Sequence, residues 1–317
     1  MSPRTLILRQ IRLEADGIAS FDLHSHDGSE LPAFSAGAHI DVQVPNGPRR
    51  SYSLVGSPTL RDRYRIAIKR TTDSRGGSRW FHESAHVGMA LEVHAPNNLF
   101  ELVENAAYTV LIAGGIGITP LLPMAERLSA LGRPWELHYT ARLGREMAFL
   151  PALQALQVAG HGHVYLYRTG EGDARPDASS IVSKAPTDSH FYVCGPNELI
   201  DAVIDATATL PPGHVHHERF SATQPAAIGG GYEVELARSG RRLSVSEGQS
   251  LLDTLLDAGL DVPFSCTQGI CGSCRITVLD GLPDHHDECL SDDERQSNQC
   301  VIACCSGSRS AVLTLDL

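Results

Sequence analysis

Four cysteines near the C-terminus constrain the fold of this chain more than any other feature. Cys266, Cys271 and Cys274 have the spacing C-x4-C-x2-C, and twenty-nine residues separate the last of them from Cys304. One tight loop with three thiolates and a distant fourth thiolate is the arrangement that holds a plant-type [2Fe–2S] cluster. The spacing therefore predicts a domain that carries electrons one at a time.

Other uses of cysteine fit the pattern less well. The chain has 8 cysteines, which could form disulfides, a zinc site or small core residues. A zinc ribbon would need two C-x2-C pairs and only one occurs, while the N-terminus carries charges where a secretion signal has its apolar core. Gly269 and Gly272 would let the backbone curl around a cluster. Because Cys304 and Cys305 are adjacent, the fourth ligand is ambiguous by one residue, and the spacing favours Cys304.

Composition and charge narrow the class of protein. With 317 residues, 42% hydrophobic and 20% charged, the chain suits two or three globular domains, and no apolar run is long enough for a membrane span. We expect a cytoplasmic monomer. Residues 232–317 hold fourteen acids against six bases, which is −8 of the net −11. That sign disfavours nucleic-acid binding, and the acids form either a solvated surface or a docking surface for a basic partner protein.

Changes in the pattern of apolar and turn residues along the chain predict its domains. Residues 1–104 contain six short alternating runs between turn residues such as Asn46-Gly47, and predict a six-stranded antiparallel β-barrel. Residues 105–222 alternate apolar strands with helical stretches, the βαβ rhythm of a parallel sheet with helices on both faces. The Gly-, Ala- and Pro-rich residues 223–231 predict a flexible linker. Residues 232–317, with a hairpin, a helix and the cysteine loop, predict a small β-grasp domain.

Two strand ends within residues 105–222 indicate a nucleotide site. LIAGGIGITP runs from an apolar strand through Gly114, Gly115 and Gly117 into a helix, which would let a diphosphate approach the helix N-terminus. The motif is not a full G-x-G-x-x-G, and a packing turn would look the same. FYVCGP, which contains Cys194, ends a second strand; alone it reads as a small buried cysteine before a turn. Together the two strand ends could wall one nicotinamide pocket.

The predicted barrel offers residues suited to a flavin. Alternation puts the Arg50 cation and the Tyr52 ring on one side of a strand and Ser53 on the other, where it would act through its backbone or at a strand edge. Downstream, residues 74–79 (SRGGSR) supply backbone N–H groups and guanidinium groups suited to a phosphate. Either segment alone could be an ordinary strand and turn, so their co-occurrence carries the prediction.

In these motifs the chain resembles the phthalate dioxygenase reductase family, which includes the reductase components of vanillate O-demethylase-type Rieske oxygenases. The resemblance covers essentially the whole chain, in the order flavin domain, nicotinamide domain, ferredoxin domain. One departure is Gly307, where relatives often have an arginine near the fourth ligand. The matching motifs are FSAGAHIDV, RRSYSL, IAIKR, SRGGSRWFHE, APNNLF, IAGGIGITP, HYTAR, YVCGP and CTQGICGSC.

The resemblance implies residues for each cofactor and for the reaction. It implies FMN rather than FAD, held at Arg50, Ser51, Tyr52, Ser53, Ile68, Lys69, Arg70, Gly76, Gly77, Ser78 and Thr119. It implies NADH at Gly114, Gly115, Gly117, Thr119, Arg142, Cys194, Gly195 and Pro196. It implies a [2Fe–2S] cluster on Cys266, Cys271, Cys274 and Cys304. The residues implied for catalysis are Tyr52, Ser53 and Cys194, with Glu218 and Phe220 on a domain-closing strand near the flavin.

The resemblance also implies the activity. NADH gives a hydride to FMN, and electrons then pass singly to the cluster and on to the Rieske centre of a separate aromatic oxygenase. One alternative is a stand-alone flavin and iron–sulfur NAD(P)H oxidoreductase with another electron acceptor. Another is a flavohaemoglobin-like or nitric-oxide-detoxifying reductase, although the sequence shows no haem domain. A plain one-electron carrier is disfavoured by the intact nucleotide motifs. The preference for NADH over NADPH is implied by the family alone, because Arg142, Arg145 and Arg168 leave room for a 2′-phosphate contact.

Overall fold

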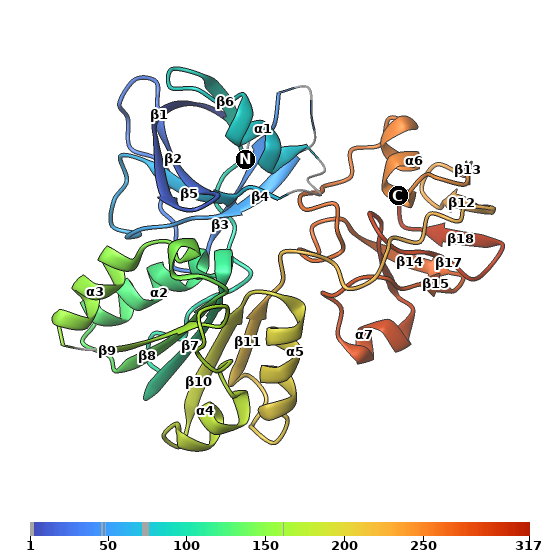
Figure 1. Cartoon of the computed structure of the whole chain (residues 1–317). Coiled ribbons are helices and arrows are strands. Elements are labelled where there is room, and N and C mark those ends of the chain that lie inside the picture. Colours follow the sequence, from blue (N-terminus) through green and yellow to red (C-terminus); the bar gives the residue numbers. More distant parts are fainter. Residues whose placement is uncertain (1–2, 46, 48, 72–75, 161) are drawn as a thin grey trace. The chain divides into compact units, whose positions relative to one another are not determined.

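The computed structural model describes residues 3–45, 47, 49–71, 76–160 and 162–317. The chain divides into two compact units, Met1–Arg219 and Phe220–Leu317. The first unit holds a barrel followed by a parallel sheet, and the second holds a smaller mixed sheet (Figure 1). None of the helices within the described ranges is long and apolar enough to cross a membrane.

The predicted six-stranded antiparallel barrel is confirmed. Its strand order is β4-β3-β6-β1-β2-β5, and a bridge between Leu54 and Ile66 joins the two end strands and closes the barrel. Side chains alternate as the sequence pattern requires, because Ile40 and Val42 are fully buried while Asp41 between them is not. The elements are β1 (Arg4–Ala15), β2 (Ile18–Ser25), β3 (His39–Gln43), β4 (Arg49–Ser53), β5 (Tyr64–Lys69), α1 (Gly77–Glu83) and β6 (Ala90–Val93).

The rest of the first unit is the parallel sheet that the βαβ rhythm predicted. Its order, β11-β10-β7-β8-β9, puts β7 in the middle, so the connections reverse direction between β7 and β10. Sheets of this kind bind ligands at the carboxyl ends of the strands beside such a reversal. Helices cover both faces of the sheet. Leu111 belongs to the hydrophobic cluster that includes residues of α2, and the next residue, Ile112, belongs to the hydrophobic cluster that includes residues of α5. The elements are β7 (Tyr108–Gly114), α2 (Ile118–Ala130), β8 (Trp135–Ala141), α3 (Leu150–Val158), β9 (Gly162–Arg168), α4 (Ala178–Lys184), β10 (Ser189–Cys194), α5 (Asn197–Ala206) and β11 (Val215–Glu218), with 3-10 turns at Gly115–Gly117 and Gly144–Glu146.

The second unit has the predicted hairpin, helix and cysteine loop. Its sheet order is β13-β12-β18-β14-β16, with β12 antiparallel to β13 and parallel to β18, as in a β-grasp fold. The helix α6 begins at a capping box formed by Ser250 and Asp253, which satisfies N–H groups of its first turn. The elements are β12 (Tyr232–Leu236), β13 (Arg241–Val245), α6 (Leu251–Asp257), β14 (Arg275–Asp280), β15 (Pro283–Asp284), α7 (Asp292–Ser297), β16 (Cys300–Ile302), β17 (Gly307–Ser308) and β18 (Val312–Leu315).

Two segments of the second unit, residues 223–231 and the acidic residues 292–294, have structural roles that composition did not predict. Within residues 223–231, expected to be a flexible linker, the N–H of Ala227 donates to the carbonyl oxygen of Cys305 at 2.7 Å. These contacts are made by backbone groups rather than apolar side chains, which is why the composition carried no signal of them. The acidic residues 292–294 form the first turn of α7, where carboxylates stabilise a helix N-terminus.

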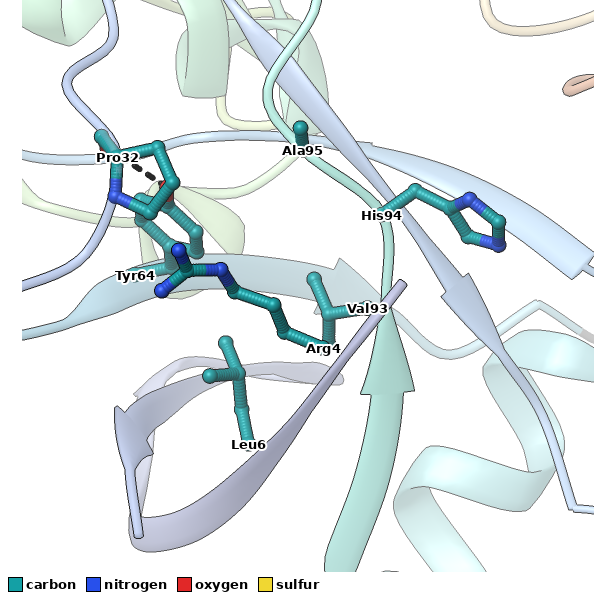
Figure 2. Close-up of a pocket in the computed structure, with 7 residues that line it drawn as sticks. All are labelled: Arg4, Leu6, Pro32, Tyr64, Val93, His94 and Ala95. Carbon is teal, nitrogen blue, oxygen red and sulfur yellow. Dashed lines mark hydrogen bonds between the residues drawn. The ribbon is translucent and has the colours of Figure 1, made fainter. Parts of the chain in front are cut away.

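A small pocket lies on the barrel between the first residues of β1 and β5 and the end of β6 (Figure 2). The Tyr64 hydroxyl in this pocket donates to the carbonyl oxygen of Pro32 at 2.7 Å. Burial and the nearby Arg49 cation lower the pKa of His94. The described residues that line the pocket include none of those predicted to bind a cofactor; they are Arg4, Leu6, Pro32, Tyr64, Val93, His94 and Ala95.

Candidate functional site

The two glycine-containing strand ends lie side by side at the carboxyl edge of the parallel sheet. β7 and β10 are neighbours, with Ala113 opposite Cys194. A Cβ on Gly117 would overlap the carbonyl oxygen of Cys194, and a Cβ on Gly114 would lie 2.5 Å from Cδ of Pro196. These two glycines are therefore required for the close packing of the two loops. The sequence also predicts that these glycines bind a cofactor at the same edge of the sheet, and that role stays a prediction.

The start of α2 is open toward this edge. Gly115 has a φ of +54°, and a Cβ there would meet no described atom within 4 Å. Thr119, in the first turn of α2, is buried, and its hydroxyl donates to the carbonyl oxygen of Ile116 at 2.9 Å. Arg142 follows the end of β8 and has an exposed side chain. The N–H groups at the start of α2 can thus receive an anionic group, with Arg142 at the end of the neighbouring strand.

A buried carboxyl group connects the last strand of the sheet to the barrel. Glu218 of β11 pairs in register with Cys194 of β10, and the Ser53 hydroxyl of β4 donates to the Glu218 carboxyl group. Burial raises the pKa of Glu218 to about 8, and Oε2 of Glu218 has no hydrogen-bond partner among the described residues. Burial, and then the charge of Glu218, raises the pKa of the Cys194 thiol. Three of the residues that the resemblance implied for catalysis thus lie together.

The remaining two residues implied for catalysis lie outside this group of three. Tyr52 is on β4, one residue before Ser53 and on the other side of that strand. Phe220 is the first residue of the second unit and is 38% exposed. The predicted roles of both residues stay predictions.

The flavin motif on β4 has the alternation that the sequence predicted. Arg50 and Tyr52 share a face, because a Cβ on Gly77 would lie 3.0 Å from both Cγ of Arg50 and the hydroxyl oxygen of Tyr52. Gly77 opens α1, so the turn predicted to hold a phosphate packs on this same face. Tyr52 meets Phe81 edge to face with ring centroids 5.3 Å apart, and burial raises the pKa of Tyr52, which keeps its phenol a hydrogen-bond donor.

The other positions implied for the flavin lie mostly at the end of β5 and the start of α1. Arg70 pairs with Glu83 of α1 at 3.2 Å, and the Ser78 hydroxyl lies 2.9 Å from that of Thr71. These contacts bring the two segments together, as a phosphate site between them requires. Ser74 and Arg75 of the same predicted loop lie outside the described residues. Of the rest, Ile68 is buried, Lys69 is exposed, Gly76 precedes α1, and Ser51 donates to Asp41 at 2.7 Å.

The four cysteines of the predicted cluster site come together in the second unit. The Cys266 thiol contacts those of Cys271 and Cys304, and the Cys304 thiol also contacts that of Cys274. Backbone N–H groups point at the sulfurs: Cys271 donates to Sγ of Cys266 at 3.4 Å, and Gly269 donates to Sγ of Cys304 at 3.2 Å. Such donors stabilise thiolates and tune iron–sulfur clusters. Four thiols with N–H donors around them fit a [2Fe–2S] cluster.

The four thiols form a chain of contacts in the order Cys271, Cys266, Cys304 and Cys274. No three His, Cys, Asp or Glu side chains in the described ranges surround one point as ligands of a single metal ion would. The Cys304 thiol contacts the thiols of Cys266, Cys274 and Cys305, whereas Sγ of Cys305 also lies 3.7 Å from the carbonyl oxygen of Ile302 in its own segment. The surroundings favour Cys304 as the fourth ligand, which is the choice that the spacing made, and the ligand set stays a prediction.

Sequence reasoning missed one residue near the cysteines. Asp287 is buried, and its backbone lies against Gly269 of the cysteine loop. The signal in the sequence is the run DHHDEC at residues 284–289, which mixes two histidines and three acids with a cysteine. From composition, these acidic residues were expected to lie on the surface, because nothing in the run itself shows which of them is buried.

The fold and these sites define a class of protein: an electron-transfer oxidoreductase with a flavin-type barrel, a nicotinamide-type sheet and a C-terminal [2Fe–2S] domain. Residues 234–308 match the family of the 2Fe-2S iron-sulfur cluster binding domain. The solved structure of phthalate dioxygenase reductase, described as a modular structure for electron transfer from pyridine nucleotides to [2Fe-2S], is similar throughout. Its TM-score is 0.79 at 39% identity, over 99% of this chain and 98% of that chain.

Two curated relatives are similar over their full lengths. Phenoxybenzoate dioxygenase subunit beta of Ectopseudomonas oleovorans is 48% identical over 318 residues, which is 100% of this chain and 98% of the relative. Tetrachlorobenzoquinone reductase of Sphingobium chlorophenolicum is 43% identical over 317 residues, which is 98% of this chain and 97% of the relative. The chain belongs to the phthalate dioxygenase reductase family, and the resemblance seen in its motifs is confirmed.

Proposed function

We propose that this chain is the reductase component of a Rieske-type aromatic oxygenase or O-demethylase system, and that it passes electrons from NADH through FMN and a [2Fe–2S] cluster to the oxygenase. One observation carries the proposal: four thiols gathered under backbone N–H donors share a chain with the paired glycine strand ends of a parallel sheet. The relatives support the choice of acceptor, since one is a dioxygenase subunit and another is phthalate dioxygenase reductase.

Each cofactor fits residues of the sites described above. The FMN ring would lie near Arg50 and Tyr52, with its phosphate at Gly77, where a Cβ would fill the cradle. NADH would lie at the carboxyl ends of β7 and β10, over residues 114–117 and 194–196, with its diphosphate at the start of α2. The [2Fe–2S] cluster would be held by the four thiols. When bound, these groups convert the hydride of NADH into single electrons for the acceptor.

The chain's own residues orient the reacting groups and exclude water from them. Cys194 is fully buried and Oε2 of Glu218 is buried, which keeps water away from these groups at the carboxyl edge of the sheet where the nicotinamide would lie. The Ser53 hydroxyl orients the Glu218 carboxyl group through its hydrogen bond. Because the pKa of Glu218 is about 8, this group holds its proton at neutral pH and places no negative charge beside the site of hydride transfer.

The Glu218→Gln variant tests this role. Folded Glu218 is protonated at pH 7 and unfolded Glu218 is ionised, so wild-type stability falls as the pH rises from about 4.5 to about 8. The variant lacks this loss, so the stability difference between variant and wild type should move in favour of the variant across that range, by about 4 kcal/mol at most. Urea unfolding at a series of pH values measures it.

The same variant has an expected kinetic signature. Stopped-flow reduction of the flavin by NADH should stay within about twofold of the wild-type rate at pH 7, because the glutamine amide keeps an uncharged group at this position. The wild-type rate should fall above about pH 8 as Glu218 loses its proton, whereas the rate of the variant should stay level. A variant rate that follows the wild-type pH profile would remove Glu218 from the reaction.

A second candidate function differs only in the acceptor. One relative is a tetrachlorobenzoquinone reductase, 43% identical over its full length, so this architecture also occurs in a protein whose name gives a small molecule as the compound reduced. The chain could then be a stand-alone flavin and iron–sulfur oxidoreductase. Purified protein supplied with NADH and a quinone, and separately with a Rieske oxygenase, separates the two candidates by the relative kcat/KM.

The central test of the proposal is NADH-dependent reduction of cytochrome c by protein with a full complement of FMN and iron. We expect reduction that depends on both cofactors, with NADH preferred to NADPH, followed by reduction of the Rieske centre of a partner oxygenase. No reduction of cytochrome c by fully loaded protein would refute the reductase function. The proposal includes a monomer located in the cytoplasm. The cytoplasmic location is supported by the eight cysteines, which are all free thiols and persist as such in a reducing compartment.

A further inference from the structure

Asp287 has a buried carboxylate, and its Cα lies against Gly269 of the loop that carries three of the four cluster cysteines. The side chain of Asp287 has an exposed fraction of 0%. Its Oδ2 accepts a hydrogen bond from the N–H of Leu290 at 2.9 Å and lies 3.7 Å from Nη2 of Arg295. Its Oδ1 is buried without a hydrogen-bond partner in the described part of the chain, and the nearest cation-forming group is Nδ1 of His285 at 3.6 Å. A buried charge that is only partly compensated is costly, so its presence calls for a role.

Gly269 links this carboxylate to the cysteines. Gly269 has a φ of +76°, and a Cβ there would lie 3.2 Å from Cα of Asp287 and 2.5 Å from Sγ of Cys305. The Gly269 carbonyl oxygen accepts a hydrogen bond from the N–H of Glu288 at 2.8 Å. On its other side, the N–H of Gly269 donates to Sγ of Cys304 at 3.2 Å. A single glycine therefore separates the Asp287 backbone from a cluster thiol.

Arg295 holds Asp287 in place from α7. Its Nη2 donates to the backbone carbonyl oxygen of Asp287 at 2.6 Å, in addition to the longer approach to Oδ2. The Arg295 side chain is 34% exposed, whereas the Asp287 side chain is not exposed at all. The cation is thus partly solvated and the anion is not, so the two charges do not cancel at the cysteines.

We propose that Asp287 is a positioning residue for the iron–sulfur centre: it fixes Gly269 against the cysteine loop, and its buried charge holds the reduction potential of the cluster low. The inference rests on the proposed function, because it requires that the cluster be present. Addition of an electron to a cluster becomes less favourable when a fixed negative charge lies nearby in a medium of low dielectric constant. Arg295 opposes this effect by screening part of the Asp287 charge.

The proposal predicts shifts of opposite sign for the two members of the ion pair. Asp287→Asn keeps the shape and an acceptor for the Leu290 N–H but removes the charge, so cluster reduction should become more favourable by about tenfold, a rise of about 59 mV. Arg295→Gln leaves the Asp287 charge less screened, so reduction should become less favourable by about threefold. A loosened loop would shift both variants in the same direction.

The experiment is a mediator titration of the full chain loaded with FMN and iron, with the reduced cluster followed by electron paramagnetic resonance. The matched control is Asp293→Asn, which removes an equal charge from an exposed position on α7. We expect the control to change the reduction equilibrium by less than about twofold, because solvent screens an exposed charge. NADH-dependent ferricyanide reduction, which needs only the flavin, verifies that each variant is folded.

The outcomes separate this inference from the function on which it rests. Equal shifts for Asp287→Asn and Asp293→Asn, or shifts of the same sign for Asp287→Asn and Arg295→Gln, would overturn the role of the Asp287 charge. Loss of the cluster from both ion-pair variants, with ferricyanide reduction intact, would leave Asp287 only its role in holding the loop and would also overturn the role of its charge. A wild-type chain that shows no [2Fe–2S] signal after reconstitution would instead refute the proposed function.

Discussion

Replacement of Cys304 by serine is expected to abolish the [2Fe–2S] absorbance and paramagnetic signals of this chain. The Cys304 thiol contacts those of Cys266 and Cys274 and accepts the N–H of Gly269, so its loss removes the ligand that comes from outside the cysteine loop. NADH-dependent reduction of cytochrome c should fall by about 100-fold or more, because electrons then have no route through the cluster. Iron analysis and the two spectra measure the loss.

The flavin reaction and the neighbouring cysteine provide the controls. NADH-dependent ferricyanide reduction should stay within about twofold of the wild-type rate, because the flavin and nicotinamide positions belong to the other unit. Cys305→Ser should keep the cluster, since Sγ of Cys305 lies against the Ile302 carbonyl oxygen. The fourth ligand is wrongly chosen if Cys305→Ser loses the cluster and Cys304→Ser keeps it.

The second large effect is expected from Gly117→Ala. The added Cβ would overlap the carbonyl oxygen of Cys194 and lie 2.8 Å from the backbone nitrogen of Gly195. Backbone atoms cannot move aside as the tip of a side chain can, so the turn before α2 must shift away from the end of β10. A shift of about 1 Å at a site of hydride transfer costs about 100-fold in rate. Stopped-flow reduction of the flavin by NADH measures it.

Gly229→Ala is the matched control for this change. A Cβ on Gly229 would meet no described atom within 4 Å, and the residue does not have a positive φ. We expect wild-type kinetics and unchanged or slightly greater stability, because alanine restricts the unfolded chain. Gly117→Ala should also retain the cluster signals, which arise in the other unit. Flavin reduction by Gly117→Ala at the wild-type rate would show that the nicotinamide does not bind at the carboxyl ends of β7 and β10.

The fold could be predicted from the sequence because its signals are local. Each barrel strand is an alternating run with turn residues at its ends, and the strand order then follows from closure of the sheet. The glycines at positions 114 and 117 were recognisable for the same reason, since strand, turn and helix follow one another in the chain. The short helices α3, α4 and α7 were not specified, because their apolar positions are few and tertiary packing fixes them.

The candidate site was predictable where it depends on spacing and not where it depends on contact. Three cysteines within nine residues indicate one ligand loop, and the other site residues were predicted from the resemblance between whole motifs. No local pattern, however, indicates that the Ser53 hydroxyl donates to Glu218, because that contact forms between a barrel strand and the last strand of the sheet. The burial of Asp287 in an otherwise acidic surface run has the same origin, since it is set by Gly269 and Arg295 from other segments.

The contact between Ser53 and Glu218 has a consequence for how chains of this kind can be recombined. It joins β4 of the barrel to β11, the last strand of the first unit, so neither the barrel nor the parallel sheet has a complete reaction centre without the other. A chimaera that joins the barrel of one protein to the parallel sheet of another would need a new contact in place of the one between Ser53 and Glu218. A cut near the boundary at Arg219 and Phe220 would leave it whole. The portion open to exchange, by an engineer or by gene fusion, is therefore the C-terminal one, which would change the electron acceptor and preserve the donor.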